Sequence, residues 1–318
     1  MTYTKKGGAM YELVNRIVGG LPYKSVSLNA VAGATRGGFT SQVFSSIKTR
    51  KSFSGKIEKG KVFTVSIDGR YLFSDLITIL HLPDNTNGRV ETMLINRALK
   101  NAKFYVAISE TTASEFKEKF GNKEVFVVKL GVDPHVQLPR DEHEGIVVSH
   151  VGGISEGDSR RLPMLQIPSV LRLAFPDKRI TFTHIGGRDN SNEQALYKAC
   201  IDNDIIPDFK SNVPTEEVWA AYAKSDLYIY MSTKEGYSLT PMEALMMGTP
   251  CLISDIAVHR EIYGGIDGVN FVRNGDVSPQ DVKNAYELGP SPKYREFALK
   301  RTWADTISEF DAVIRKVA

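Results

Sequence analysis

The stretch from Met231 to Glu261 reads MSTKEGYSLTPMEALMMGTPCLISDIAVHRE. An apolar segment over residues 227–231 precedes it and predicts a strand. Two glutamates, Glu235 and Glu243, lie eight positions apart around a glycine-containing turn. The stretch therefore predicts a strand, a loop, a short helix and a second strand, with one acid in the loop and one in the helix.

Signals for the start and end of a helix surround Glu243. Thr240 offers a hydroxyl cap, Pro241 is tolerated in a first helical turn, and Glu243 follows three residues after the cap. Gly248 and Pro250 end the helix before the next apolar run. The pattern predicts a capping box at the start of a helix over residues 241–247.

A helix N-terminus after a glycine-containing loop presents free backbone N–H groups and a positive dipole end, which suit a phosphate. A carboxylate beside a phosphate is repulsive unless it binds something else, and the hydroxyls of sugars and ribose are strong donors to it. Glu235 and Glu243 could thus hold two sugar rings on either side of a diphosphate. The alternative is that Glu243 only completes the capping box and Glu235 is solvated.

The segment from Glu235 to Ala244, together with Gly248-Thr249-Pro250, resembles the E-x7-E signature of retaining glycosyltransferases of family 4. The likeness extends to Ser254 and to His259-Arg260-Glu261, and it departs at Tyr237-Ser238, where Phe-Gly is commoner. The resemblance implies the GT-B fold, in which two Rossmann-like domains face a cleft that holds a nucleotide sugar. It also implies a C-terminal helix that crosses back to the first domain.

Strands and helical patterns alternate along the whole chain, which by itself favours an α/β fold with parallel sheets. We expect a first, acceptor-side domain over residues 1–138 and a second, nucleotide-sugar-binding domain over residues 139–299, with the helix at about 300–318 returning to the first. In the first half, strands are expected at 25–30, 62–68, 76–81, 104–109 and 125–129, and helices at 9–18, 89–102 and 112–120. In the second half, strands are expected at 145–151, 180–185, 208–210, 227–231, 250–253 and 269–272. The helices expected there lie at 162–174, 192–203, 215–225, 241–247, 259–263 and 280–288, followed by one or two amphipathic helices over 294–317.

Two candidate site features lie in the first half. Gly7 and Gly8 precede a predicted helix, and paired glycines at such an entrance let backbone approach a phosphate. His81 ends a predicted strand, at the edge where open parallel sheets bind ligands. The resemblance implies that Gly7 and Gly8 abut the leaving phosphate of the donor and that His81 lines the reaction centre. The alternatives are a simple turn and a surface histidine.

Further candidates follow two predicted strands of the second half. Gly152 follows the first strand, and the family usually has an arginine next, where this chain has Gly153. Arg160 or Arg161 could supply the charge that neutralises the diphosphate, and the sequence does not choose between them. Gly186 resembles a family glycine near the nucleotide, although a generic turn explains it equally well.

The resemblance implies a role for each of these residues. Glu235 would hold the donor sugar, with His81 beside it as the second catalytic candidate, and Glu243 would hold the ribose. The backbone of the loop residues Gly236, Tyr237, Ser238 and Leu239 would bind the diphosphate. Electrostatic stabilisation of this kind needs no metal, and no cofactor is expected other than the nucleotide-sugar donor, with UDP or GDP as its nucleotide. An Asp202-Asn203-Asp204 sequence lies at a helix end and does not suit a metal site.

Composition and charge limit the remaining classes. With 318 residues, 42% hydrophobic content and 24% charged residues, the chain fits a soluble enzyme with two compact domains. Neither a signal-peptide core nor a membrane span is present in the sequence, and the two cysteines lack metal-ligand spacing, which favours a cytoplasmic location. Although the net charge is only +3, the first half of the chain is basic. Its basic residues are concentrated between Arg36 and Lys61, where phenylalanines lie among them.

The basic region suggests three kinds of acceptor or partner. It would suit a lipid-linked or otherwise anionic acceptor and peripheral contact with a membrane, or nucleic acid, while the bland interpretation is a solvated loop. Two alternative functions stay open. A non-catalytic, glycosyltransferase-like binding protein is favoured by the short first strand and by the missing arginine after Gly152, and a DNA-modifying sugar transferase is favoured by the basic first half alone. The donor nucleotide, the sugar and the acceptor are not determined by the sequence.

Overall fold

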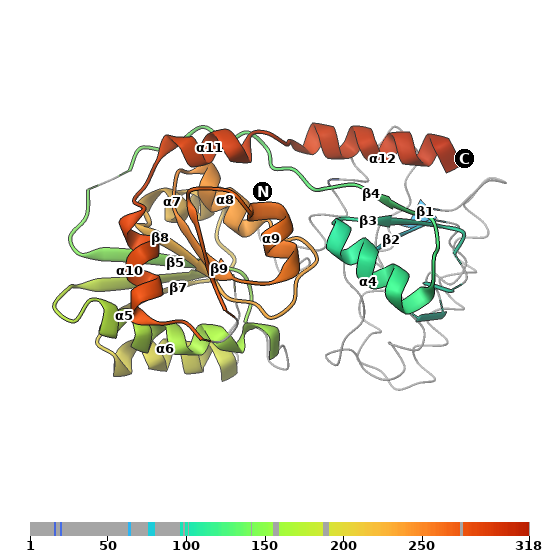
Figure 1. Cartoon of the computed structure of the whole chain (residues 1–318). Coiled ribbons are helices and arrows are strands. Elements are labelled where there is room, and N and C mark those ends of the chain that lie inside the picture. Colours follow the sequence, from blue (N-terminus) through green and yellow to red (C-terminus); the bar gives the residue numbers. More distant parts are fainter. Residues whose placement is uncertain are drawn as a thin grey trace. The chain divides into compact units, whose positions relative to one another are not determined.

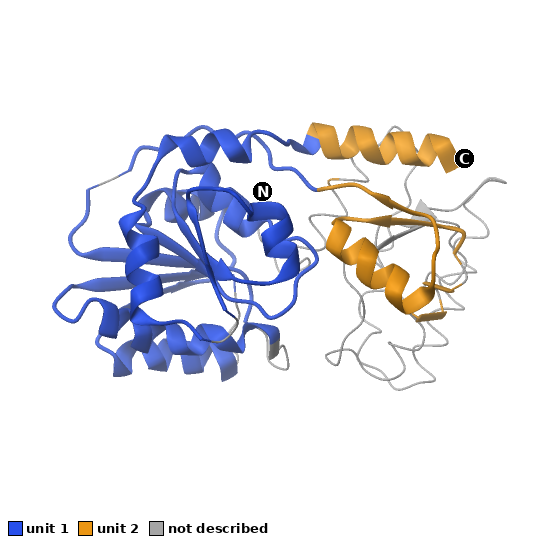
Figure 2. Cartoon of the chain, viewed as in Figure 1, with its two compact units in different colours: residues 1–8, 130–303 blue, residues 9–129, 304–318 orange. Residues whose placement is uncertain are grey.

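The computed structural model describes residues 16, 20, 63–64, 76–79, 96–97, 99–100, 102–140, 142–154, 159–186, 191–273 and 276–317 (Figure 1). These residues form two compact units (Figure 2). Unit 1 contains Leu130–Trp303, and unit 2 contains the described residues up to Lys129 together with the C-terminal segment from Ala304. The boundary expected at residues 138–139 lies nine positions after this division between Lys129 and Leu130, in a stretch without helix or strand.

Unit 1 is built on one six-stranded, fully parallel sheet in the order β10-β9-β8-β5-β6-β7. The strands are β5 (Ile146–Val151), β6 (Ile180–Ile185), β7 (Ile206–Lys210), β8 (Leu227–Tyr230), β9 (Cys251–Ser254) and β10 (Val269–Val272). All residues of β5, β8 and β9 are buried, as expected for central strands of a parallel sheet that is covered on both faces.

The order of these strands determines where a ligand site belongs. The first strand of this sheet along the chain is β5, which lies in the middle of the sheet. The next strands, β6 and β7, extend the sheet on one side of β5, and β8 then pairs with β5 on its other side. In open parallel sheets, ligands bind beyond the carboxyl ends of the strands where the order reverses. In unit 1 that point lies between β5 and β8.

Helices lie on both faces of this sheet (Figure 1). They are a 3₁₀ segment η3 (Ser159–Gln166) and the α-helices α5 (Ile167–Ala174), α6 (Ser191–Asp202), α7 (Thr215–Lys224), α8 (Thr240–Met246), α9 (Ala257–Tyr263), α10 (Pro279–Glu287) and α11 (Pro292–Ala298). The main core cluster joins apolar side chains of β5, β6 and β8 to those of α5, α6 and α10. The helix expected over 162–174 is divided, because Pro163 lies inside η3 and Pro168 begins the α-helical part at its first turn.

Unit 2 contains a four-stranded parallel sheet in the order β1-β2-β3-β4. The strands are β1 (Phe63–Thr64), β2 (Leu76–Ile79), β3 (Phe104–Ala107) and β4 (Val125–Val127), with helix α4 (Glu110–Phe120) between β3 and β4. Ser109 caps α4 by accepting from the backbone N–H of Thr112 at 3.1 Å.

The C-terminal helix α12 (Trp303–Val317) packs in unit 2 although it follows unit 1 in the chain (Figure 2). Thr306 Oγ1 donates to the Lys129 carbonyl at 3.0 Å, and the Lys316 ammonium lies 4.7 Å from the centre of the Phe126 ring. Both units are thus α/β structures with parallel sheets, as the sequence predicts. Within the described part of the chain, no helix is long and apolar enough to cross a membrane.

Candidate active site

The loop between β8 and α8 places Glu235 at the carboxyl edge of the unit 1 sheet, beside β5, and Glu243 follows in α8. Glu235 Oε1 accepts from Arg161 Nη2 and from Ser232 Oγ, both at 2.7 Å. The Arg161 guanidinium carbon lies 4.3 Å from the centre of the Tyr230 ring. The side chains of Arg161 and Glu235 are only 11% and 12% exposed, so this ion pair is much less screened by water than a surface pair.

Two glycines bring the ends of β5 and β6 close together. Gly152 has φ 141° and Gly186 has φ 133°, values that side-chain-bearing residues rarely adopt. A Cβ added to Gly186 would lie 3.0 Å from the backbone of Gly152. Glycine is therefore required where these two strands end, and the backbone there is bare of side chains.

Ser238 is held in an unusual backbone conformation by its neighbours. Its φ is 71°, in the left-handed region that is costly for a residue with a Cβ. Ser238 Oγ lies 2.9 Å from His259 Nε2, His259 Nδ1 lies 2.8 Å from the Ser254 carbonyl, and the Tyr263 hydroxyl donates to the Ser238 carbonyl. Burial lowers the pKa of His259, so the ring is neutral, donates from Nδ1 to Ser254 and accepts from the Ser238 hydroxyl at Nε2.

The start of α8 differs from the prediction. Leu239, with φ −79° and ψ −27°, already has helical geometry and makes no side-chain cap, so the predicted capping box at Thr240 and Glu243 is wrong. Thr240 Oγ1 instead accepts from the Tyr228 hydroxyl at 2.8 Å, and Glu243 Oε2 accepts from the Tyr222 hydroxyl at 2.9 Å. The alternative in which Glu243 is merely a capping residue is thereby removed.

Tyr237 ties the loop to the beginning of unit 1. Its side chain is buried, and its hydroxyl donates to the Leu130 carbonyl at 2.6 Å. The loop over 232–239 is therefore anchored through the side chains of Glu235, Tyr237 and Ser238.

A histidine pair lies beneath the glycines. His150 and His184 are directly opposite each other on β5 and β6, with their Nδ1 atoms 2.9 Å apart and their rings stacked at 7°. His184 Nε2 lies 3.3 Å from Glu193 Oε1 on α6. The pKa of His150 is held well below its ordinary value, first by burial and then by the neighbouring His184 and Arg161.

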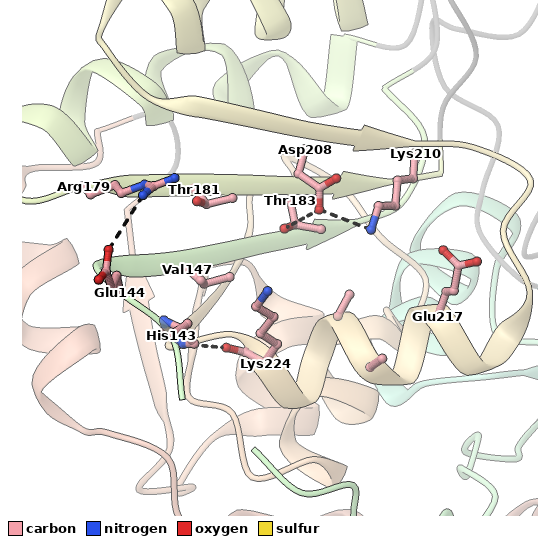
Figure 3. A pocket seen from close by; sticks show the side chains of 12 residues that line it. His143, Glu144, Val147, Arg179, Thr181, Thr183, Asp208, Lys210, Glu217 and Lys224 are labelled. Atoms are coloured by element: carbon pink, nitrogen blue, oxygen red, sulfur yellow. Dashed lines mark hydrogen bonds and ion pairs between the residues drawn. The ribbon is translucent and has the colours of Figure 1, made fainter. Parts of the chain in front are cut away.

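A pocket of about 350 Å³ lies elsewhere in unit 1, over β5, β6, β7 and α7 (Figure 3). Its labelled residues include His143, Arg179 and Lys224, which lie toward the amino ends of β5 and β6 and the end of α7 (Figure 3). None of the residues predicted for the site lines this pocket. The pocket is therefore separate from the glutamate loop.

Comparison with known proteins fits this geometry. Residues 146–287 match the family model described as "Glycosyl transferases group 1", a segment that spans β5 to α10 and includes the glutamate loop. These findings support a glycosyltransferase. No curated relative matches the sequence.

Solved structures of GT-B glycosyltransferases share the fold over most of the chain. Sucrose-phosphate synthase from Thermosynechococcus elongatus aligns with TM-score 0.69 at 14% identity, over 93% of this chain and 81% of that one. The α,α-trehalose 6-phosphate synthase from Burkholderia multivorans gives TM-score 0.65 at 11% identity, over 88% and 75%. HepE from Anabaena, solved with UDP and glucose, gives TM-score 0.62 at 13% identity, over 88% and 76%. The predicted GT-B fold is confirmed.

The glycosyltransferase-like segment brings together most of the site residues that the sequence singles out in the second half. Gly152, Arg161, Gly186 and Glu235 meet at the carboxyl edge of the sheet, and Gly236, Tyr237, Ser238, Leu239 and Glu243 continue from it into α8. Of the two arginines between which the sequence did not choose, Arg161 reaches Glu235. Arg160 contributes its carbonyl, which accepts from the Thr233 N–H at 3.0 Å.

Three predicted site residues, Gly7, Gly8 and His81, lie outside the described residues, as does the basic region from Arg36 to Lys61. From the sequence, no site role was predicted for His150, His259 or Tyr230. A usable signal was present for the first, because a histidine stands two residues before the glycine in both His150-Val151-Gly152 and His184-Ile185-Gly186. Among the described residues, no group of three or more His, Cys, Asp and Glu side chains could hold a metal ion.

Proposed function

We propose that the chain is a retaining glycosyltransferase of the family 4 type, which transfers a sugar from a nucleotide diphosphate sugar to an acceptor hydroxyl. The observation that carries the proposal is the position of Glu235 in the loop after β8 and of Glu243 in α8, at the reversal point of the strand order. Three of the similar structures are complexes with UDP, so UDP sugars are the first donors to test, with GDP sugars next.

The proposed donor grip follows from the chemistry of the two acids. Glu235 is held by Arg161 and Ser232 through Oε1, which fixes the carboxylate in one orientation for the hydroxyls of the donor sugar. Glu243, held by Tyr222, would accept from the ribose hydroxyls. The diphosphate would then lie between them, against the backbone N–H groups of residues 236–239.

The leaving diphosphate gains negative charge as the glycosidic bond breaks. Backbone N–H groups and the Arg161 guanidinium are pre-oriented at this site and need no reorganisation during the reaction. These groups supply the stabilisation for which a metal ion is used elsewhere, and we propose that the reaction is metal-independent. A covalent glycosyl-enzyme route would need a carboxylate on the far face of the sugar, and we propose attack from the leaving-group side instead, with His81 near the donor sugar.

A second candidate function is a non-catalytic relative that binds an acceptor or a partner. Two observations favour it: Gly153 replaces the arginine expected after Gly152, and the carboxylate of Glu235 already carries an ion pair with Arg161. The proposed enzyme is cytoplasmic, with a lipid-linked or other anionic acceptor and peripheral membrane contact through the region from Arg36 to Lys61.

The test is a screen of UDP and GDP sugars for thermal stabilisation and slow hydrolysis, followed by transfer to candidate acceptors. An enzyme is expected to be stabilised by one nucleotide sugar and to release its sugar in the same anomeric configuration, which NMR of the product measures. Stabilisation without hydrolysis or transfer would favour the binding relative. Inversion at the anomeric carbon would contradict the retaining mechanism, and full transfer by Glu235→Gln would contradict the assignment of the donor grip.

A further inference from the structure

The histidine pair, together with Glu193, forms a buried chain of hydrogen bonds that we call the histidine relay (His150, His184 and Glu193). His150 and His184 are 0% and 1% exposed, and Glu193 is 7% exposed. The contacts are 2.9 Å between the two Nδ1 atoms and 3.3 Å between His184 Nε2 and Glu193 Oε1. Three polar side chains with fixed partners in an apolar interior require a definite arrangement of protons.

The carboxylate determines that arrangement. Glu193 Oε1 accepts, so we assign a proton to His184 Nε2 and the acceptor role to its Nδ1. His150 must therefore carry its proton on Nδ1 to donate to His184. In the neutral ring this leaves a lone pair on His150 Nε2, which is buried and has no hydrogen-bond partner among the described residues.

The unpartnered nitrogen lies beside the bare backbone of Gly152. A Cβ built on Gly152 would lie 3.8 Å from His150 Nε2 and 3.4 Å from Arg161 Nη1. The absence of a side chain at Gly152 thus lets an imidazole and a guanidinium converge on one point at the carboxyl end of β5. This point is where the strand order reverses and where an anionic group of a nucleotide is expected.

Among the described residues, three groups that carry charge or can titrate face His150 from elements packed against β5. His184 faces it from β6, Arg161 from η3, and Tyr230 from β8 at 5.9 Å between ring centres. Burial, His184 and Arg161 all disfavour a charged His150, so the ring is neutral without a ligand. An oxyanion placed against Gly152 would favour the charged form of His150. The Glu193 carboxylate at the far end of the relay would offset part of that positive charge.

We propose that His150 takes up a proton on Nε2 when the diphosphate of a nucleotide binds against Gly152, so that the histidine relay supplies the positive charge that Gly153 cannot. This inference rests on the proposed function. One proton comes from solvent and forms the Nε2–H bond, which donates to a phosphate oxygen. The Nδ1–H of His150 remains directed at His184, and no other bond forms or breaks.

The test measures proton uptake when UDP binds to the full chain. Titration calorimetry in several buffers of different ionisation enthalpy, at about pH 7 to 8 where the phosphates of UDP are almost fully ionised, gives the number of protons bound. For the wild type we expect uptake approaching one proton per UDP, and a Kd that rises by up to about tenfold per pH unit as the pH increases. Any uptake by UDP itself is present in every variant and is subtracted with His150→Gln.

His150→Gln keeps a neutral donor near the position of Nε2 but cannot become charged, so its proton uptake is expected to vanish and its Kd to lose the pH dependence. Glu193→Gln is expected to reduce the uptake, because it removes the offsetting carboxylate without touching Gly152. The matched control is His143→Gln. The wild-type His143 lies in the separate pocket, where its ring donates from Nε2 to the Lys224 carbonyl at 3.1 Å (Figure 3). This control should take up protons as the wild type does.

A measurement on the wild type alone tests the proposal even if the variants fail to fold. Histidine ¹⁵N NMR is expected to show that Nε2 of His150 becomes protonated on addition of UDP. If UDP binds without proton uptake and without this change, the proposal is overturned while the proposed function stands. If no nucleoside diphosphate binds at all, both the proposed function and the proton uptake by His150 are contradicted.

Discussion

Arg161 Nη2 donates to Glu235 Oε1 at 2.7 Å, although the two residues are 74 positions apart in the sequence. The pair joins η3 to the loop after β8, and the face of the Tyr230 ring lies under the guanidinium. The same arginine therefore orients the acid proposed to bind the donor sugar and places positive charge beside the proposed diphosphate. Loss of either partner should affect both stability and donor binding.

A double-mutant cycle with Arg161→Gln and Glu235→Gln tests this coupling. Because both side chains are nearly buried, we expect an interaction of about 1–3 kcal/mol in the free energy of unfolding, measured with denaturant. The control is the exposed pair Arg315–Asp311 on α12, for which an i,i+4 interaction of about 0.3–0.5 kcal/mol is expected. Equal couplings for the two pairs would show that burial adds nothing to the Arg161–Glu235 contact.

Ser238 tests the balance between backbone strain and a buried hydrogen bond. Ser238→Ala keeps the Cβ in the left-handed region and leaves His259 Nε2 without its donor, so we expect a loss of about 1–3 kcal/mol. Ser238→Gly loses the same hydrogen bond but removes the strain, and it should be more stable than the alanine variant by about 1 kcal/mol. Thermal or denaturant unfolding of the two variants measures the difference, and an alanine variant as stable as the glycine variant would contradict it.

The limits of strands and helices were predicted better from the sequence than the side-chain contacts between them. The limits of β6 and β10 agree with the prediction, because apolar β-branched runs bounded by turn residues are local signals. The capping box failed because Leu239 was already helical, which depends on Ser238 being held at φ 71° by His259 and Tyr263. Tertiary contacts of this kind leave no local pattern in the sequence.

The same distinction holds for the site. The E-x7-E spacing indicated Glu235 and Glu243, since the motif lies within one loop and one helix. The choice of Arg161 over Arg160 depends on how η3 turns, and the pairing of His150 with His184 depends on the register of β5 against β6. Neither can be obtained from one sequence without the fold.

Two buried neutral histidines should make unit 1 sensitive to acid. The pKa values of His150 and His259 are lowered in the folded state, mainly by burial, whereas the unfolded chain titrates near the ordinary value of about 6.5. The unfolded chain therefore binds protons first, so stability present above about pH 6.5 is lost as the pH falls through that value. Denaturant midpoints between about pH 8 and pH 5 are expected to fall for the wild type and to fall less for His150→Gln and His259→Gln. Parallel pH profiles for all three proteins would contradict this prediction.

Gly131 allows the chain to enter unit 1 beside the segment that leaves it. Val132 and Thr302 form a parallel bridge, and a Cβ on Gly131 would lie 2.1 Å from the Thr302 carbonyl oxygen. Because backbone cannot move away as a side-chain end can, Gly131→Ala is expected to cost about 2–4 kcal/mol of unfolding free energy. The control is Gly265→Ala, at φ 82° with no atom within 4 Å of its Cβ, where only the left-handed penalty of about 1–2 kcal/mol is expected.

Glu243 offers a test of the ribose contact that does not require knowledge of the acceptor. If its carboxylate accepts from ribose hydroxyls, the wild type should bind UDP more tightly than 2′,3′-dideoxy-UDP by about 10- to 100-fold, as expected for hydrogen bonds to a charged acceptor. Glu243→Gln should lose most of this preference, with little change in its affinity for the dideoxy nucleotide. Tyr222→Phe removes the hydroxyl that donates to Oε2 at 2.9 Å and leaves the carboxylate charged, so it should keep the preference but weaken it. Calorimetric Kd values for the two nucleotides and three proteins measure these effects, and an unchanged preference in Glu243→Gln would place the ribose elsewhere.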